Sequence, residues 1–429
     1  MSKRRLNNGH HAKSHGRDAR KPGSVIAALD IGSSKVAAFI VRAEDEDGFT
    51  VLGFSHQLAQ GIRGGTITDL SAAGAIGHCI HNAEKMAGLQ VDDVIVNVAG
   101  SHMAAHSATG GAALNGLAID EGDIGRALTE ARALPEPETR AIVQGIPIRY
   151  RVDGDSGVDN PRGLCGRLLE ADVTIVTGCA NRLRNLDRCI GENHLAIGAR
   201  CASGYAAGLA TLHADESELG CLLLDIGGGT TDIAVFRDGA PVYLDSLPLG
   251  GQHLTNDLAR GLTTTVSCAE RLKTMYGSLI HHSGGRGDIV EVPQVGEDDP
   301  GCANQVATST MTSILRPRME EILELVRSRL TDAGVDRAAG RRAVLTGGAS
   351  QIGGMREFAQ QALGKQVRLG RPLARFGLAD ANGGPAFATG VGLILYALRN
   401  LDHAAEPTAL APPSSPWFGR VGQWLRLNL

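Results

Sequence analysis

The sequence predicts an α/β fold of two similar halves, with a small α+β module inserted into the first half. The main observation is a repeated pattern, LDIGSSKVAAFI at residues 29–40 and DIGGGTTDIAVF at residues 225–236. In both copies an apolar run ends in Asp-Ile, and a turn rich in Gly or Ser leads into a second apolar run, which is typical of a β-hairpin. Strand-like and helix-like segments alternate around both copies, as they do in α/β proteins.

The predicted elements of the first half begin near Val25. Two strands at 24–32 and 35–43 enclose a tight turn, and a third strand follows at 50–58. A helix is predicted over 69–88, with Asp69 or Ser71 as its N-cap and Gly88 at its end. The inserted module, residues 91–178, contains strand-like segments at 93–100, 141–152 and 169–178 and one helical segment at 120–134, and a further helix follows at 181–192.

The second half continues after the second hairpin. Its predicted elements are helices at 249–262, 267–277 and 308–334, a strand, Gly turn and helix within 341–364, and a closing segment at 384–400. Residues 402–416 contain four prolines and predict a linker.

Composition is that of an ordinary soluble globular protein. The 429 residues are 43% hydrophobic and 21% charged, which is enough chain for two to four structural lobes. The eight cysteines lack CxxC or Cys/His ligand spacing, so we expect neither a disulfide framework nor a zinc site, and a reducing cytoplasm fits. We also expect no secretory signal and no spanning helix, since no apolar run approaches ~18–20 residues.

The net charge of −4 is unevenly distributed. Residues 1–24 carry seven Lys or Arg and one Asp, a charge of +6 that leaves −10 for the rest. Residues 1–23 have little to bury and predict a basic disordered tail. Such a tail could contact anionic lipid or DNA. Most such runs are only solvated, so nucleic acid is not an expected partner.

The two hairpins predict a phosphate site. Gly or Ser at a hairpin tip lets backbone N–H groups approach an anion, and an Asp at a strand end can orient waters around Mg²⁺. One such hairpin could be only a turn, but two facing copies would hold a nucleoside triphosphate from both sides. The predicted binding residues are Asp30, Gly32, Ser33, Ser34, Lys35, Asp225, Gly227, Gly228, Gly229, Thr230 and Thr231, with Asp30 and Asp225 near Mg²⁺ through water.

A third Gly-rich segment, LTGGASQIGGM at 345–355, ends a predicted strand and begins a predicted helix. A helix N-terminus offers free N–H groups and partial positive charge. Gly347 and Gly348 would let a nucleoside lie against the backbone, and Ser350 completes the GGxS turn. Alone, this motif fits an ordinary turn equally well.

The order of hairpin, hairpin and GGxS turn resembles the actin/Hsp70/hexokinase superfamily, and within it the FtsA family of bacterial cell-division proteins. The resemblance runs from about Val25 to Asn400 and returns in the last residues. Beside the hairpins and the GGxS turn, it rests on GGTITDL (64–70), GIPIRYRVDG (145–154), ASGYAAGLATL (202–212), LPLGGQHLTNDLA (247–259), AERLKTMYG (269–277), VEVPQVG (290–296) and ILRPRMEEI (314–322).

This resemblance implies an actin-like ATPase fold with ATP between the halves. It implies polymers on the cytoplasmic face of the inner membrane that tether the FtsZ ring at the septum and recruit later divisome proteins. The implied subdomains are 1A (24–90 and 179–218, with the closing helix 386–400), 1C (91–178), 2A (219–254 and 336–385) and 2B (255–335).

The resemblance also implies roles for two pairs of residues. Glu270 and Lys273 match the AExxK pattern that flanks adenosine in related sites, although an ordinary surface ion pair is the alternative. Arg316 and Arg318, within 255–335, are candidates for binding acidic groups of the FtsZ C-terminal peptide, unless they only stabilise their helix.

Residues 417–429 after the linker (401–416) predict an amphipathic membrane helix. At 100° per residue one face of about 140° carries Trp417, Phe418, Val421, Trp424, Leu425 and Leu429. Trp, Phe and Leu opposite Arg is the composition of a helix lying in a membrane interface, and the resemblance implies the same. Docking on the protein's own body is the alternative, against which the long linker argues.

Two other functions are compatible with the superfamily, a small-molecule kinase and an Hsp70-like chaperone. A kinase needs a catalytic carboxylate and has no use for the amphipathic tail, while a chaperone needs a peptide-binding domain after residue 400. We identify no clear base or nucleophile in the sequence, so at most weak ATPase activity is expected.

Overall fold

The computed structural model describes residues 23–400, apart from 45–47, 117, 134–136, 281–288, 297–302 and 374–382. The predicted basic tail up to residue 22, the linker and the helix at 417–429 lie outside the described residues. None of the helices in the described part of the chain combines the length and hydropathy needed to cross a bilayer.

Each half contains a five-stranded sheet, and the two sheets share one topology. The orders are β3-β2-β1-β6-β11 and β14-β13-β12-β17-β18, with an antiparallel hairpin at the centre and parallel strands beyond it. The prediction of two similar halves is therefore confirmed. The first sheet consists of β1 (Val25–Ile31), β2 (Lys35–Ala43), β3 (Phe49–Leu58), β6 (Asp93–Val98) and β11 (Ala196–Ala202). The second consists of β12 (Cys221–Ile226), β13 (Thr231–Arg237), β14 (Ala240–Leu247), β17 (Arg342–Thr346) and β18 (Gln366–Leu369).

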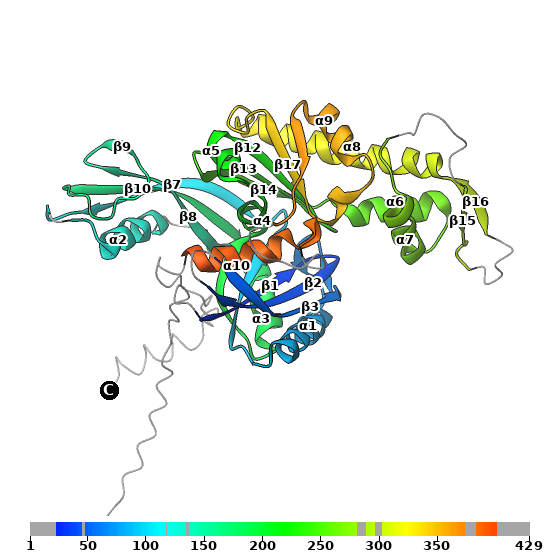
Figure 1. The fold of residues 1–429 in the computed structure, drawn as a ribbon, viewed down its shortest axis with the longest axis horizontal. Helices are drawn as coiled ribbons and strands as arrows, with labels where there is room; N and C mark the ends of the chain where they lie inside the picture. Colours follow the sequence, from blue (N-terminus) through cyan, green and yellow to red (C-terminus); the bar gives the residue numbers. More distant parts are fainter. Residues whose placement is uncertain are drawn as a thin grey trace, which may run out of the picture.

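Helices pack on both sheets (Figure 1). The first half has α1 (Ser71–Ala87), α3 (Ala180–Gly191) and α4 (Ser203–Thr211), with α5 (Ala214–Leu219) leading into the second half. The second half has α6 (Gly251–Leu262), α7 (Val266–Tyr276), α8 (Thr308–Asp332), α9 (Met355–Leu363) and the short helices η2 (Gly348–Gln351) and η4 (Pro385–Phe387), and α10 (Ala388–Asn400) ends the described chain. Two small hairpins complete it, β4 (Ile62–Arg63) with β5 (Thr66–Ile67) and β15 (Ile289–Val292) with β16 (Asn304–Ala307).

The cap of α1 differs from the prediction. Gly88 ends the helix in the left-handed conformation, as expected, but the N-cap residue is Leu70, which makes no side-chain cap. The Asp69 carboxylate instead accepts a hydrogen bond from the Ser71 N–H, from one position before the N-cap residue.

The inserted module is a four-stranded sheet covered by α2 (Glu121–Arg132). Its order is β7-β10-β8-β9, formed by β7 (Ala104–Ala113), β8 (Arg140–Val152), β9 (Asp155–Val158) and β10 (Leu168–Cys179). Three details differ from the predicted module, and one is that β9 was not predicted as a strand. The strand at 93–98 pairs with β1 and β11 and so belongs to the first sheet, and β7 was not predicted because its small residues lack strand propensity.

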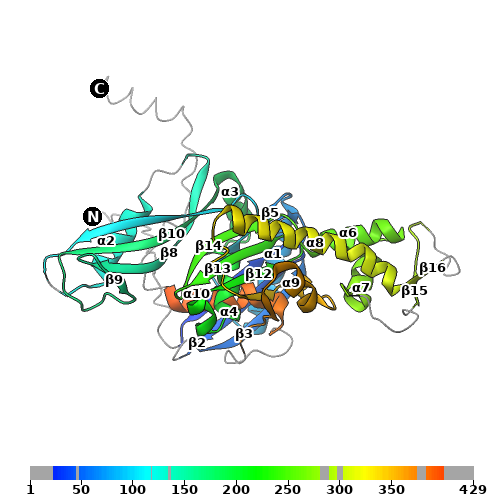
Figure 2. The same ribbon diagram turned by 90° about the horizontal axis from the view of Figure 1, so that it is seen from above.

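The module and the lobe formed by α6, α7, β15 and β16 lie at opposite ends of the molecule (Figure 1, Figure 2). The module packs beside the edge strand β14 of the second half, where the Thr174 hydroxyl donates to the Pro241 carbonyl at 3.1 Å. The inserted module therefore contacts both halves.

The two halves meet through α4 and α10, which pack on each other at the centre of the molecule (Figure 1). Helix α10 lies on β1 and β2, and α4 contacts β12 and β13. Their backbones approach so closely that a Cβ on Gly392 would lie 1.8 Å from the Ala206 carbonyl oxygen. Only glycine allows this approach.

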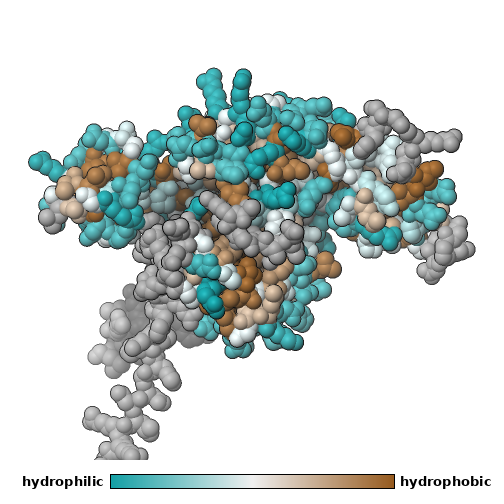
Figure 3. Space-filling view, viewed as in Figure 1, coloured by the Kyte–Doolittle hydropathy of each residue, from teal (hydrophilic) through white to brown (hydrophobic). Residues whose placement is uncertain are grey.

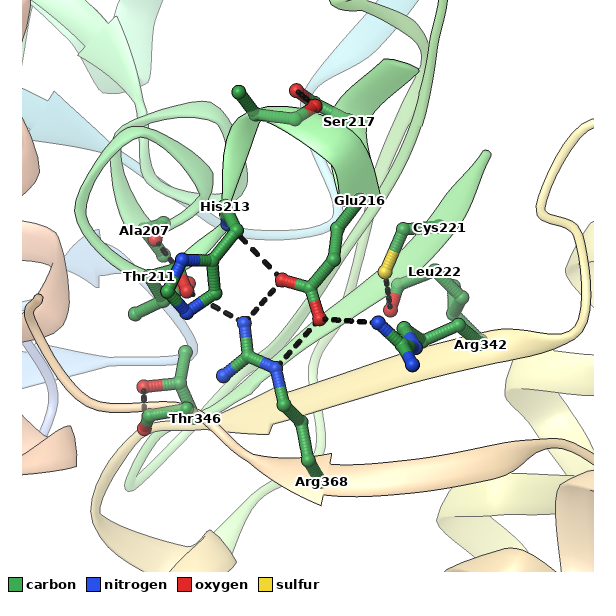
Figure 4. Close-up of polar contacts among 12 residues, drawn as sticks. Ala207, Thr211, His213, Glu216, Ser217, Cys221, Leu222, Arg342, Thr346 and Arg368 are labelled. Carbon is green, nitrogen blue, oxygen red and sulfur yellow. Dashed lines mark hydrogen bonds and ion pairs between the residues drawn. The ribbon is translucent and has the colours of Figure 1, made fainter. Parts of the chain in front are cut away.

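A buried carboxylate secures the connection from α4 to the second sheet (Figure 4). Glu216 of α5 is 5% exposed. Its carboxylate accepts hydrogen bonds from two nitrogens of the Arg368 guanidinium, from Arg342 at 3.4 Å and from the His213 main-chain N–H at 3.0 Å. Arg368 also donates to the Thr211 carbonyl at the end of α4, at 2.8 Å. Burial alone would raise the pKa of Glu216, but the hydrogen bonds from Arg368 and His213 outweigh it and hold the pKa low.

Candidate functional site

A cleft of about 510 Å³ lies between the two halves. Most of the predicted binding residues line it, from both hairpins, from α7 and from the third Gly segment. These are Asp30, Gly32, Ser33, Ser34, Lys35, Asp225, Gly227, Gly228, Thr230, Glu270, Lys273, Gly347 and Gly348. Segments more than 300 residues apart are thus brought to one cavity.

The tips of the two hairpins face each other across this cleft. In strands β1 and β12 the next-to-last residue is an Asp, Asp30 in one and Asp225 in the other, and each is 8% exposed. The tips are in contact, since a Cβ on Gly228 would lie 2.7 Å from the Ser34 Cβ. Any side chain at residue 228 would therefore push the hairpins apart.

Both carboxylates are unfavourably placed as anions. Burial raises the pKa of Asp30 to about 6, although the charge of Lys35 opposes the shift, and Asp225 raises it further. Burial also raises the pKa of Asp225, against the Thr389 hydroxyl, which donates to it at 2.6 Å, and against Lys35. A cation beside them would favour the ionised forms.

The carboxylates fit a hydrated Mg²⁺ better than a directly coordinated metal. No group of three or more His, Cys, Asp or Glu that could hold a metal ion occurs among the described residues. Mg²⁺ keeps much of its water shell and takes one or two carboxylates plus phosphate oxygens. Asp30 and Asp225 match that ligand set.

A third buried acid, Asp232, also lines the cleft and was not predicted. It is 4% exposed and faces Asp225 in the hairpin register. Its Oδ1 has no hydrogen-bond partner in the described part of the chain, while the Thr230 hydroxyl donates to Oδ2 at 3.4 Å. Burial, and then the charge of Asp225, raise the pKa of Asp232 to about 8. The sequence signal for this residue was an acid directly before the apolar run IAVF, within the second hairpin.

Lys35 is held by the start of the closing helix. Its ammonium donates to the Ala386 carbonyl at 2.5 Å and lies 4.7 Å from the centroid of the Phe387 ring. A cation over an aromatic ring is stabilised by the negative face of the ring. The predicted phosphate ligand therefore also links the first hairpin to η4.

Three predicted residues do not line the cleft. The Thr231 side chain is fully buried and donates to the Leu249 carbonyl at 2.8 Å, so its hydroxyl is not available to a phosphate in the cleft. The Ser350 hydroxyl is likewise buried and donates to the Gly347 carbonyl at 2.8 Å. Gly229 packs against Ser33, where a Cβ would lie 2.5 Å from the Ser33 oxygen.

The third Gly segment ends a strand and begins a helix, as predicted, but the helix begins at the last residue of the segment and not at Gly347 and Gly348. The residues following Gly347 form the four-residue 3₁₀ helix η2, and the α-helix α9 begins only at Met355. The free N–H groups at this end of the cleft therefore belong to a 3₁₀ turn.

Glu270 and Lys273 form an ion pair on α7, with 2.7 Å between the Lys273 Nζ and a Glu270 carboxylate oxygen. Lys273 is nearly buried and also donates to the Gly251 carbonyl at 3.1 Å and to the Thr255 hydroxyl at 2.8 Å. The ion pair thus exists and lies in the cleft wall, and contact with adenosine stays a prediction.

Several other residues line the cleft but were not predicted as binding residues, namely Gly65, Asn97, Ser203, Gln252, Gln351, Ala386 and Thr389. Asn97 shows why they are needed. Its Oδ1 accepts from the Ile31 N–H at 2.7 Å, and its amide nitrogen donates to the Ser203 hydroxyl at 3.1 Å. It therefore fixes the end of β1, directly before the first hairpin turn.

Arg316 and Arg318 lie on α8, outside the cleft. Arg318 pairs with Asp257 at 2.7 Å and with Glu321, and the Arg316 guanidinium lies 5.2 Å from the centroid of the Phe358 ring. Both side chains therefore have structural contacts of their own.

Comparison with known proteins gives matches over almost the whole chain. The family model described as cell division protein FtsA matches residues 222–392, and the one described as an SHS2 domain inserted in FtsA matches residues 100–177. The cell division protein FtsA of Agrobacterium fabrum is 40% identical over 421 residues, which cover 95% of each chain.

Solved structures show the fold. A type IV pilus biogenesis complex of PilM and PilN matches with a TM-score of 0.61 at 16% identity, covering 88% of this chain and 99% of that one. MreB5 of Spiroplasma citri bound to ADP matches with a TM-score of 0.52 at 14% identity, covering 87% and 95%. The fold is that of the actin-like ATPases, with the inserted SHS2 domain, and the fold prediction is confirmed.

The raised pKa of Asp232 predicts a pH-dependent stability without nucleotide or Mg²⁺. Because the folded protein binds this proton more tightly than the unfolded chain, the stabilisation is complete below the ordinary pKa of 3.8 and is lost as pH rises towards 8. Relative to Asp232→Asn, the wild type should lose at least about 1.4 kcal/mol, the value of one pKa unit, between about pH 5 and pH 8.

Urea unfolding of both proteins in EDTA at each pH measures this difference. Glu170→Gln, an exposed acid of the inserted module, is the control for general charge effects. A constant difference between the wild type and Asp232→Asn across this range would contradict the raised pKa.

Proposed function

The chain belongs to the family of the cell division protein FtsA, and on this basis we propose that it is an ATP-binding, actin-like division protein that polymerises on the inner membrane and anchors the FtsZ ring. The observation that carries the nucleotide part is the cleft with two facing hairpin tips. Buried Asp30 and Asp225 lie at equivalent strand ends, and the glycine-containing tips pack directly against each other.

The cleft is lined by groups that can bind the phosphates and the adenosine of ATP. Backbone N–H groups at the tips and the hydroxyls of Ser33, Ser34 and Thr230 face it and can donate to phosphate oxygens. Glu270 and Lys273 at the other end, with Gly347 and Gly348, would hold the adenosine. A bound Mg²⁺ would neutralise phosphate charge beside Asp30 and Asp225.

Asp232 gives the cleft a carboxylate whose unpaired oxygen can accept a proton or a hydrogen bond from a water. Its raised pKa brings it near neutral pH, which suits a weak general base. Slow ATP hydrolysis is consistent with this arrangement. Membership of the FtsA family leaves a small-molecule kinase or an Hsp70-like chaperone without support.

Membrane attachment is assigned to the helix predicted at 417–429. One such helix should bind reversibly, because each apolar side chain gains ~1.5–3 kcal/mol when fully buried while ordering the backbone costs ~1–2 kcal/mol per residue. Polymerisation would present many tails together and raise the avidity by orders of magnitude. This places the protein at the cytoplasmic face of the inner membrane, at the septum.

The FtsZ C-terminal peptide is assigned to residues 255–335, which comprise most of α6, together with α7, β15, β16 and α8. The surface of this lobe is rich in exposed apolar residues, and Figure 3 shows hydrophobic surface at this end of the molecule. Met275 of α7 is 63% exposed and Ile289 of β15 is also 63% exposed. Arg318 is already neutralised by Asp257, so Arg316 is the better candidate for the acidic groups of the peptide.

The first prediction concerns Asp225. Asp225→Ala should abolish the Mg²⁺-dependent part of ATP binding, because the cation loses a carboxylate beside the phosphates, while the protein stays folded. Titration calorimetry with ATP, with and without Mg²⁺, measures it. Asp257→Ala, an acid of the second half outside the cleft, is the control, and an unchanged Mg-ATP affinity of Asp225→Ala would show that the site is misplaced.

The second prediction concerns the tail. Trp424→Glu places a charge on the apolar face and should release the protein from anionic liposomes, as should deletion of 417–429, with ATP binding intact. Arg426→Ala is the milder comparison, since it removes one peripheral charge and should weaken binding modestly, more so at low salt. Co-sedimentation with liposomes, with and without ATP, measures membrane binding. If Trp424→Glu pellets with liposomes as well as the wild type does, the tail is not the membrane anchor and docks on the protein's own body instead.

The third prediction concerns the FtsZ peptide. Met275→Ser should weaken binding of an FtsZ C-terminal peptide about fivefold or more, because it removes exposed apolar surface from the proposed site. The double variant Arg316→Ala, Arg318→Ala should also bind the FtsZ peptide more weakly than the wild type does.

Fluorescence anisotropy with a labelled peptide measures these affinities. Met86→Ser is a matched control, since Met86 is 65% exposed but lies on α1 in the first half. Equal affinity of Met275→Ser and the wild type would exclude this face of α7, and equal affinity of the double Arg variant would exclude the arginines.

A further inference from the structure

Gln252, in the first turn of α6, contacts both hairpins at once. Its main-chain N–H donates to the Gly228 carbonyl at 2.7 Å, at the tip of the second hairpin. Its side-chain amide nitrogen donates to the Ser33 carbonyl at 2.9 Å, at the tip of the first hairpin. One residue thus connects the tips of two hairpins that come from different halves of the molecule.

We propose that Gln252 is a positioning residue that sets the distance between the two hairpins and thereby positions the phosphates of the bound nucleotide. This inference rests on the proposed nucleotide-binding function. The side chain lines the cleft and is half-buried, so its hydrogen bond is partly shielded from water.

The hydrogen bond from the Gln252 side chain to the Ser33 carbonyl has a larger effect on the cleft than an ordinary surface contact, because each hairpin tip is held within its own half. The Ser33 hydroxyl accepts from the Gly65 N–H at 3.2 Å, so the first tip is fixed from its own half as well. The second tip is fixed by the first turn of α6, where the Gly251 N–H donates to the Gly227 carbonyl at 2.9 Å. Each tip is therefore rigid within its half, and Gln252 couples one to the other.

The two ends of the cleft depend differently on this coupling. The predicted phosphate donors come from both halves, so their mutual distance changes if the halves separate. The predicted adenosine contacts, Glu270, Lys273, Gly347 and Gly348, all belong to the second half. Loss of the Gln252 bond should therefore weaken phosphate binding and leave adenosine binding nearly unchanged, because catalytic and binding groups tolerate little displacement.

Gln252→Met tests this directly, since methionine has a similar length but no amide donor, and the backbone bond to Gly228 is retained. Affinities for ATP, ADP and adenosine, all with Mg²⁺, are measured by titration calorimetry. We expect ATP and ADP to bind about five- to tenfold more weakly, as for loss of one hydrogen bond, and adenosine to change by less than about twofold. Gln252→Asn keeps the amide but is one methylene short, and it should behave in the same way.

Gln351→Met is the matched control. Gln351 lines the adenosine end of the cleft, and its amide donates at 3.5 Å to Gly348 within its own turn, so it does not connect the halves. This variant should keep the wild-type ratio of ATP to adenosine affinity. Urea unfolding without nucleotide checks that all three variants fold, and Gln252→Asn carries the test if Gln252→Met does not.

The outcomes separate the two proposals. If the wild type binds no ATP, the proposed function fails and the role of Gln252 fails with it. If the wild type binds ATP and the Gln252 variants bind it equally well, the positioning role alone is overturned. Equal weakening of ATP and adenosine would also overturn it, because that result indicates a general structural defect.

Discussion

The structure depends on the close approach of two backbone turns, Gly228 against Ser34, each at the end of a central strand carrying a buried carboxylate. Neither half alone forms the cleft, because Asp30 and Asp225 come from different sheets. Burial raises the pKa of both acids, and for Asp30 the charge of Asp225 adds to the effect, so burial in this cleft disfavours their ionised forms. A cation held beside them, as in the proposed nucleotide site, would favour the ionised forms.

The geometry of that approach also depends on contacts far from the turns. Helices α4 and α10 cross between the halves with almost no space at Gly392, and the Glu216 cluster fixes the end of α4 to β17 and β18. The start of α10 and the preceding helix η4 also reach the cleft, since Thr389 of α10 donates to Asp225 and the Ala386 carbonyl of η4 accepts from Lys35. The closing helix therefore contacts both hairpins, and it is the last described element before the predicted linker and membrane helix.

Much of the fold could be predicted because its signals are local. The strands of both hairpins, the helices α1, α2, α3, α7 and α8, and the Gly88 cap follow from residue periodicity and from Gly placement. Strand β7 and helix α4 gave no such signal, since one consists of small residues and the other is buried on nearly all sides. Strand β6 was predicted, but it was assigned to the inserted module and not to the first sheet. Its pairing with β1 and β11 joins segments that are distant in the chain, and local periodicity carries no information on such pairing.

By itself, the sequence determined the two hairpins, the acids at their strand ends and the third Gly turn, since each depends only on residues that are adjacent in the chain. The tertiary structure decided which side chains face the cleft. The Thr230 side chain faces the cleft, whereas the Thr231 side chain is buried and donates to the Leu249 carbonyl. Successive residues of an extended chain point to opposite sides, and the geometry of the turn determines which of the two side chains faces the cleft. Asn97, Gln252 and Thr389 reach the site only because the packing of the two halves brings distant segments together.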